Sequence, residues 1–123
     1  MASIGDEVFD EGLDKLDTDA DRIDICSQEP TSYAEATSTY TLGNKTSPTV
    51  SAPADRGGGG REVTVSAIAD GSVTDNGTAT HIAIVDTVNS LLLATAALAS
   101  SQAMTSGNTW TLTQFTVGIP DPA

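Results

Sequence analysis

The chain has 123 residues with a single cysteine, a single histidine and a formal net charge of −12, from 17 acidic and 5 basic residues. The length fits one domain with one core, and the lone Cys26 and His81 exclude a disulfide scaffold and a Cys/His zinc site. Eleven of the acidic residues lie between Asp6 and Glu35. Their negative field argues against nucleic acids and anionic membranes as partners, and it favours either solubility or a basic protein partner.

The first expected element is a short amphipathic helix over residues 5–16. Ser3 and Asp6 have the spacing of a capping box. Four apolar residues then fall roughly on one face of the helix, whose other face is acidic: Val8, Phe9, Leu13 and Leu16. These four are the candidate interface residues, which either pack on the same subunit or reach a neighbouring one. Residues 1–21 are thus expected to form an acidic helix and turn.

The stretch DTDADRID, residues 17–24, spaces its aspartates as calcium loops do. A calcium loop of the EF-hand type that begins at Asp17 needs glycine at its sixth position and glutamate at its twelfth. Arg22 and Gln28 occupy these positions, and Asp24 falls inside an alternating segment, RIDIC, that predicts a strand at 22–26. We therefore expect an acidic turn from helix to strand, with no metal and no cofactor.

The middle of the chain carries few periodic signals. One short strand is expected at 38–42, followed by a loop over 43–60 that is rich in Gly, Pro and Ser. Within it, DRGGGGR lacks the GK[ST] ending of a phosphate loop and precedes a strand, so it predicts a flexible loop or hairpin arm.

The second half of the chain reads as a series of short strands. REVTVSAIA at 61–69 alternates apolar and polar residues, DGS and DNG are turn tripeptides, and Asn76 and Gly77 have the composition of a tight hairpin turn. TATHIAIVD at 78–86 and LLLATAAL at 91–98 are expected as adjacent strands, with a helix as the alternative for the second because Leu and Ala favour helices.

The last segment, TWTLTQFTVGI at 109–119, changes its apolar face partway, which predicts a bulge or a move from one sheet to another. Short strands at this spacing predict a mainly β fold. We expect a single domain over 1–123 that is an antiparallel β-sandwich with a short N-terminal helix.

No residue pattern predicts catalysis. His81 lies in the middle of an expected strand, and the chain has no GxSxG sequence to expose a nucleophile. Cys26 ends another strand with Arg22 as its only basic neighbour, so we expect it to pack in the interior. No catalytic residue is assigned, and the chain is not expected to be an enzyme. The start of the chain lacks signal-peptide features, and the longest apolar run, 91–99, is about half a membrane span.

Four segments carry a resemblance along nearly the whole chain. They are DEGLDKLDTDADRIDICSQEPTSYAEATSTYTLGNKT, GREVTVSAIADGSVTDNGTATHIAIVD, LLLATAAL and TSGNTWTLTQFTVGI. Together they resemble a group of small structural proteins of tailed bacteriophages and prophages. The shared pattern consists of turns and strands and contains no catalytic motif, so no site residue is carried over.

The resemblance implies a β-sandwich component of the virion, made in the host cytoplasm. A head decoration protein that binds the major capsid protein or other virion proteins in many copies, or as a homo-oligomer, is the leading expectation; repeated engagement would strengthen such binding. The alternatives are a tail, neck or fibre protein, and a carbohydrate- or receptor-binding module that stacks ligands on Trp110, Tyr33 or Tyr40.

Overall fold

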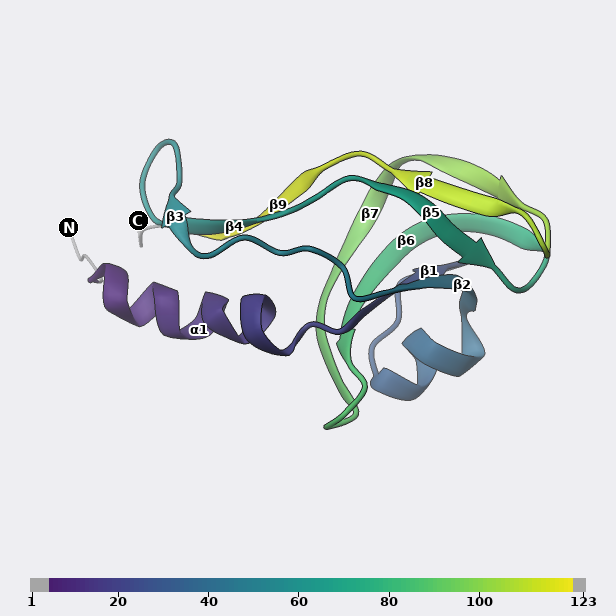
Figure 1. Ribbon diagram of the computed structural model, residues 1–123, viewed down its shortest axis with the longest axis horizontal. Helices are drawn as coiled ribbons and strands as arrows, with labels where there is room; N and C mark the ends of the chain where they lie inside the picture. Colours follow the sequence, from purple (N-terminus) through teal and green to yellow (C-terminus); the bar gives the residue numbers. More distant parts are fainter. Residues whose placement is uncertain (1–4, 121–123) are drawn as a thin grey trace.

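The computed structural model describes residues 5–120 (Figure 1). Its elements in chain order are α1 (Asp6–Asp19), β1 (Arg22–Cys26), a π-helical turn η1 (Glu35–Thr39), β2 (Thr41–Thr46), β3 (Ala54–Asp55), β4 (Arg61–Val65), β5 (Ile68–Val73), β6 (Gly77–Asp86), β7 (Leu91–Met104), β8 (Thr109–Leu112) and β9 (Phe115–Ile119). In this part of the chain no helix has the length and apolar character needed to cross a membrane.

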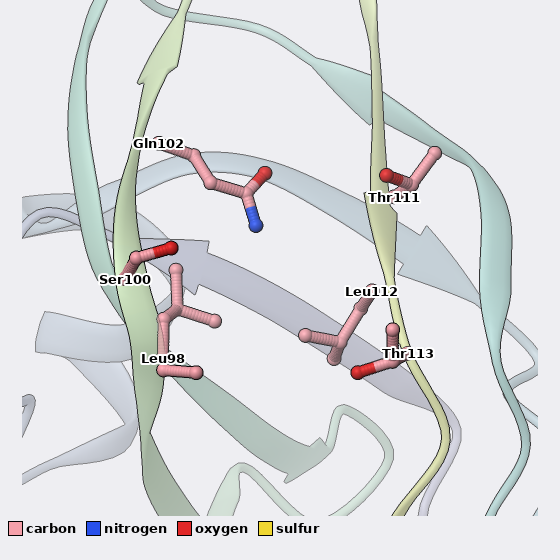
Figure 2. A pocket seen from close by; sticks show the side chains of 7 residues that line it. Leu98, Ser100, Gln102, Thr111, Leu112 and Thr113 are labelled. Carbon is pink, nitrogen blue, oxygen red and sulfur yellow. The ribbon is translucent and has the colours of Figure 1, made fainter.

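The strands form two antiparallel sheets. The larger has the order β7-β6-β1-β2-β5-β8 and the smaller the order β3-β4-β9. With the helix at the N-terminal end, this confirms the expected fold class, which is mainly β and sandwich-like with a short N-terminal helix. The larger sheet curls, so that its two edge strands, β7 and β8, approach one another (Figures 1 and 2).

One bent ribbon of two antiparallel chain segments connects the sheets. β4 pairs with β9 in the smaller sheet, and β5, which follows β4, pairs with β8 in the larger one. In β8 the buried side chain is Trp110, at an even position. After the bend at 113–114 the partly buried apolar side chains of β9 are at odd positions: Phe115, Val117 and Ile119. The predicted change of face within 109–119 is therefore confirmed as a move between sheets.

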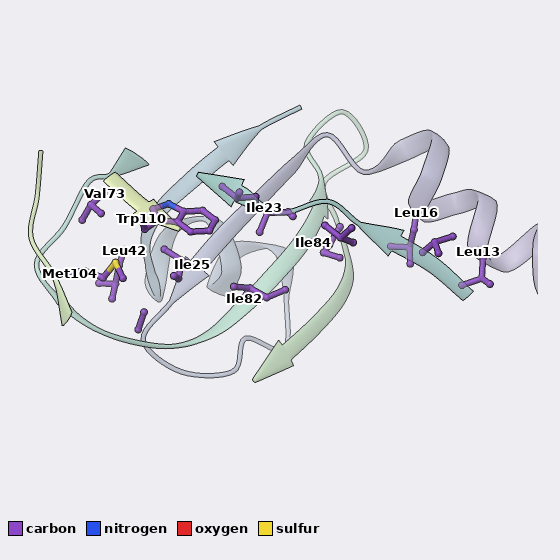
Figure 3. Packing of buried hydrophobic residues seen from close by; sticks show 14 residues of the cluster. Leu13, Leu16, Ile23, Ile25, Leu42, Val73, Ile82, Ile84, Met104 and Trp110 are labelled. Carbon is purple, nitrogen blue, oxygen red and sulfur yellow. The ribbon is translucent and has the colours of Figure 1, made fainter. Parts of the chain in front are cut away.

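The main core lies on the inner face of the curled sheet (Figure 3). Ile23 and Ile25 of β1 meet Ile82 and Ile84 of β6, while Trp110 enters from the edge strand β8. Each of these side chains is almost fully buried, and burying one aliphatic side chain of this size contributes about 1.5–3 kcal/mol. The alternating pattern of β1 therefore places its isoleucines where the sequence predicted.

A second apolar cluster covers the outer face of the same sheet. The segment between β1 and β2 folds over this face, and its Ala36 packs with Cys26, Ala83 and Val85. Both faces of the central strands β1 and β6 are thus covered. This explains why Asp24, on the outer face of β1, is buried as well.

Helix α1 packs against the smaller sheet, mainly on β4. It ends at Asp19, later than the predicted end at 16, and the backbone N–H of Ala20 donates to the Leu16 carbonyl as its C-cap. Gly5 is the N-cap and offers no side-chain cap; the expected capping residue, Ser3, lies outside the described residues. The added turn contains Asp19, which forms an ion pair with Lys15 one helical turn earlier.

Two boundaries predicted for the middle of the chain were wrong. Residues 35–39 form η1, and the strand expected at 38–42 runs instead from 41 to 46, so the first residues of the expected 43–60 loop belong to β2. The physical reason is that β1 and β5 flank this segment and supply backbone partners on both sides. The glycine run 57–60 connects the antiparallel strands β3 and β4. Of the two predicted alternatives, a flexible loop or a hairpin arm, the structure therefore shows the hairpin.

Both turn predictions between 69 and 77 were also wrong. DGS lies inside β5, where Gly71 pairs with Trp110. DNG does not close a hairpin, because β5 and β6 are not neighbours in the sheet. Asn76 instead accepts a hydrogen bond at Oδ1 from the backbone N–H of Ser106, at 2.9 Å. The side chain therefore joins two connections at one end of the sheet.

The long β6–β7 hairpin agrees with prediction. The two strands pair from Gly77 with Met104 to Asp86 with Leu91, so the segment from 91 is a strand and the helical alternative is wrong. The register of pairing shifts between Ala79 and His81 of β6, which pair with Gln102 and Ala97 of β7. The β7 residues between these two, 98–101, have no partner in the ladder. This bulge lies at the outer edge of the sheet.

Candidate functional site

Three of the four aspartates in the stretch 17–24 accept hydrogen bonds from donors of the protein itself, Asp19 from Lys15 and the other two as follows. Asp21 accepts hydrogen bonds from the backbone N–H and the hydroxyl of Thr87, at 2.9 and 2.8 Å. Asp24 accepts two from Arg22, at 2.6 and 2.8 Å, and one from the Thr41 hydroxyl, at 2.7 Å. Within residues 5–120 no group of three or more His, Cys, Asp or Glu side chains could hold a metal ion.

The ion pair between Asp24 and Arg22 has a structural role on the outer face of β1. The Asp24 side chain is fully buried, and the Arg22 side chain is 24% exposed. Two parallel N–H to carboxylate contacts and the Thr41 hydroxyl satisfy the buried oxygens. Removal of Arg22 would leave the Asp24 carboxylate unpaired in the interior, which is strongly destabilising.

Cys26 lies beneath the segment that covers the outer face. Its Sγ is 3.6 Å from the carbonyl oxygen of Ala36. Burial, aided by the negative charge of Asp24, raises the pKa of the thiol to about 12. Because the thiolate is the reactive form, the burial and raised pKa of Cys26 disfavour its reaction in the folded chain. This fits the interior packing expected for it.

His81 of β6 contacts its neighbour Thr80 and the segment that connects β1 and β2. Its Nδ1 lies 2.9 Å from the hydroxyl of Thr80, and its Nε2 lies 3.7 Å from a carboxylate oxygen of Glu29. The Thr80 hydroxyl donates its proton to the carbonyl of Ser27, at 2.9 Å. The Thr80 oxygen is therefore an acceptor toward His81, an arrangement opposite to that of an activated nucleophile.

The alternative of a stacking site on Trp110, Tyr33 or Tyr40 depends on how exposed these aromatic residues are. Trp110 is 2% exposed, and its Nε1–H donates to the carbonyl of Ser72, at 3.1 Å. Tyr33 and Tyr40 pack on the cluster around Cys26. Trp110 is therefore a core residue with its polar atom satisfied, so its ring is not available to stack on a sugar.

The candidate interface residues of α1 divide into two groups. Phe9, Leu13 and Leu16 are buried, and Leu13 and Leu16 belong to the main core cluster of the same chain. Val8 is 65% exposed. Three of the four residues thus follow the intramolecular alternative, and only Val8 is accessible to a neighbouring molecule.

A groove lies between the facing edges of β7 and β8 (Figure 2). Its volume is about 240 Å³, and its lining residues are Leu98, Ala99, Ser100 and Gln102 of β7, with Thr111, Leu112 and Thr113 at the end of β8. Leu98 and Leu112 face one another across it, and hydroxyl and amide groups surround them. The groove presents two leucines, neutral polar groups and strand backbone, a composition suited to an extended peptide segment.

Both edges belong to a stretch without charge. Thr87 to Pro120 contains no Asp, Glu, Lys, Arg or His, although the chain as a whole has 22 Asp, Glu, Lys and Arg residues (17 + 5). The sequence predicts strands in this stretch. It does not predict that β7 and β8 are the edge strands of the sheet, because their position depends on how distant segments pair. The absence of charge was nevertheless readable in the sequence and marks the region.

The chain matches no protein-family model, no curated protein and no solved structure.

Proposed function

We propose that this chain is a non-enzymatic structural protein of a bacteriophage virion, and that it decorates the capsid by binding the major capsid protein in many copies. The resemblance of its sequence to small structural proteins of tailed phages supports this role. A mainly β fold of two antiparallel sheets is compatible with it.

The observation that carries the proposal is that the potentially reactive side chains are engaged in contacts within the protein. Cys26 is buried and protonated, the hydroxyl beside His81 donates elsewhere, and Asp24 is tied to Arg22. Each of these three groups is thus engaged in contacts within the fold. On the described surface, exposed apolar side chains and edge strands are available for contacts with other proteins.

Binding to undecorated capsids tests the proposal. Purified chain is titrated onto purified capsids that lack it, and the bound amount is measured after sedimentation of the particles. We expect saturable binding with a stoichiometry that follows the number of capsid protein subunits. An unrelated acidic protein of similar size and charge controls for nonspecific attraction. No binding at saturation would contradict the proposal, and binding restricted to tails or necks would assign the alternative role.

Val8 and Val88 provide a matched pair for locating the contact. Both valines are strongly exposed, at 65% and 83%, but they lie on α1 and on the β6–β7 turn respectively. If α1 contacts the shell, Val8→Ser weakens capsid binding and Val88→Ser leaves it unchanged. The reverse result would place the contact at the β6–β7 turn.

A further inference from the structure

Asn76 and Gly77 lie at the junction between β5 and β6, and both residues are exposed. The side-chain Oδ1 of Asn76 accepts a hydrogen bond from the backbone N–H of Ser106, at 2.9 Å, in the connection between β7 and β8. Because glycine has no Cβ, the backbone nitrogen that follows Asn76 meets little steric hindrance when it approaches the side-chain amide. The pair therefore has the sequence and the exposure that favour deamidation.

A tight turn positions the Ser106 N–H. The backbone N–H of Asn108 donates to the carbonyl of Thr105, at 3.1 Å, and Gly107 has a φ of 90°. This bond and this φ are typical of a type II turn that has Ser106 as its second residue and glycine as its third.

Two further hydrogen bonds attach this turn to the end of β5. The backbone N–H of Gly107 donates to the carbonyl of Val73, at 3.0 Å. The Ser106 hydroxyl donates to the carbonyl of Thr74, at 3.1 Å. The N–H donor is thus already in place at the Asn76 oxygen before any reaction begins.

The other asparagines of the chain differ from Asn76 in sequence and in surroundings. They are Asn44, Asn89 and Asn108, and the residue that follows each one carries a side chain. Asn44 pairs with strands on both sides, and the side-chain amide of Asn89 donates to Asp86, at 2.8 Å. Only Asn76 combines a following glycine with a backbone N–H donated to its Oδ1.

The Gly77 nitrogen lies where the sheet opens most easily. Gly77 and Met104 form the terminal pair of the β6–β7 ladder. Terminal pairs open at a lower free energy than pairs in the centre of a sheet. Opening of this pair gives water access to the Gly77 N–H, whose proton must leave before the nitrogen can form a new bond.

We infer that Asn76 deamidates in the folded chain and that the Ser106 N–H promotes this reaction. The Gly77 nitrogen releases its proton to water and bonds to Cγ of Asn76, while negative charge develops on Oδ1. The Ser106 N–H stabilises that charge, as a preorganised donor does at an oxyanion. The bond from Cγ to the side-chain nitrogen then breaks, ammonia leaves with a proton from water, and a succinimide ring remains. Water opens the ring at either carbonyl, which yields aspartate or isoaspartate.

The two products affect this end of the sheet differently. Aspartate at position 76 keeps an oxygen acceptor for the Ser106 N–H and adds one negative charge to the net charge of −12. Isoaspartate also adds a methylene to the backbone directly before β6, which displaces the acceptor from Ser106. The connection between the two ends of the sheet thus changes as the protein ages. The reaction does not depend on any role in a virion.

Peptide mapping by mass spectrometry tests the inference on the purified, folded chain after incubation at mildly alkaline pH. Digestion at mildly acidic pH prevents further reaction during preparation. We expect the mass gain of amide-to-acid conversion at Asn76, and little gain at Asn44, Asn89 and Asn108 over the same time. An unmodified Asn76, or a faster reaction at another asparagine, would overturn the inference. This comparison needs no variant.

Ser106→Pro isolates the hydrogen bond. Proline is favoured at the second position of a type II turn and has no N–H, so the turn is kept while the donor to Asn76 is lost. We expect deamidation of Asn76 to slow by about threefold to tenfold, less than the loss of an oxyanion donor costs an enzyme, because water can replace the N–H at an exposed site.

Ser106→Ala is the matched control. It removes the hydroxyl bond to Thr74, as Ser106→Pro also does, but it keeps the backbone N–H. Its Asn76 should deamidate at the rate of the unmodified chain. Equal rates in the two variants, or a faster reaction in Ser106→Pro, would overturn the role assigned to the Ser106 N–H. Circular dichroism of both variants establishes that they are folded.

Discussion

The contact between Gly71 and Trp110 controls how the inner core closes. The two residues pair across β5 and β8, and a Cβ at position 71 would overlap the indole ring. Gly71→Ala therefore forces the ring or the strand to move, and overpacking of this kind costs about 1–3 kcal/mol of unfolding free energy. Urea unfolding followed by the fluorescence of the single tryptophan measures this loss.

Gly57→Ala is the control for that substitution. A Cβ at Gly57 meets nothing within 4 Å, so the unfolding free energy should change little. An unchanged urea midpoint for Gly71→Ala would contradict the packing described for Trp110.

Asp86 fixes the turn between β6 and β7 and makes stability depend on pH. Its carboxylate accepts hydrogen bonds from the Asn89 side chain, at 2.8 Å, and from the backbone N–H groups of Val88 and Asn89. These bonds, the Asn89 side chain foremost, lower the pKa of Asp86 from its usual 3.8. The stabilisation is therefore complete above the pKa of the unfolded chain and is lost as pH falls through the lower pKa of the folded chain.

Asp86→Asn should unfold at a lower urea concentration than the unmodified chain near neutral pH. The difference should begin to shrink as the pH falls below about 4, where the carboxylate of the unfolded chain becomes protonated, and should vanish once the pH passes the lower pKa of the folded chain. Asp75→Asn, at an exposed aspartate in another connection, controls for the loss of one negative charge. A difference that persists unchanged at low pH would contradict the role given to the Asp86 carboxylate.

Among the elements, α1 depends on one arginine for its polar attachment. Arg61 of β4 contacts Asp10 of α1, at 2.9 Å, and Asp55 of β3, at 2.6 Å. These hydrogen bonds raise the pKa of Arg61 further, so it remains charged throughout the range in which the fold is stable. Because the same side chain joins a helix and two strands, its loss should loosen α1 before the larger sheet.

Arg61→Gln should accelerate amide hydrogen exchange in residues 6–19 while exchange in β1 and β6 stays slow. Lys45→Gln is the matched control, since it removes one positive charge that pairs with Asp70 on the larger sheet. It should leave exchange in α1 unchanged. Equal acceleration in α1 and in the central strands would show that Arg61 supports the fold as a whole and not the helix in particular.

Elements with local signals were predictable from the sequence. RIDIC alternates and is β1, and the change of face around Gln114 marks the move between sheets. β2 and β5 were misplaced because Gly43 and Gly71 read as loop residues. Their glycines are required by close neighbours instead: a Cβ would overlap the Ser72 carbonyl at the first and the Trp110 ring at the second. Neither neighbour is visible without the tertiary fold.

At the scale of the whole molecule, features that depend on how distant strands pair were not predictable from the sequence. The DTDADRID stretch, which departs from the EF-hand pattern at Arg22 and Gln28, forms the expected turn from helix to strand between α1 and β1. Trp110 is not available for the alternative stacking role, because it becomes buried when the sheet curls. The groove between β7 and β8 escaped prediction for the same reason, since two segments become edges only after every other strand has paired.

The central claim is that this chain is a repeated structural component of a phage particle. Quantitative mass spectrometry of purified particles, with the amount of this chain expressed relative to the major capsid protein, tests it most directly. We predict an amount comparable to that of the major capsid protein, as decoration of a repeating shell requires. A small number of copies per particle would contradict decoration and indicate a neck, tail or fibre position, and absence from the particle would contradict the virion role itself.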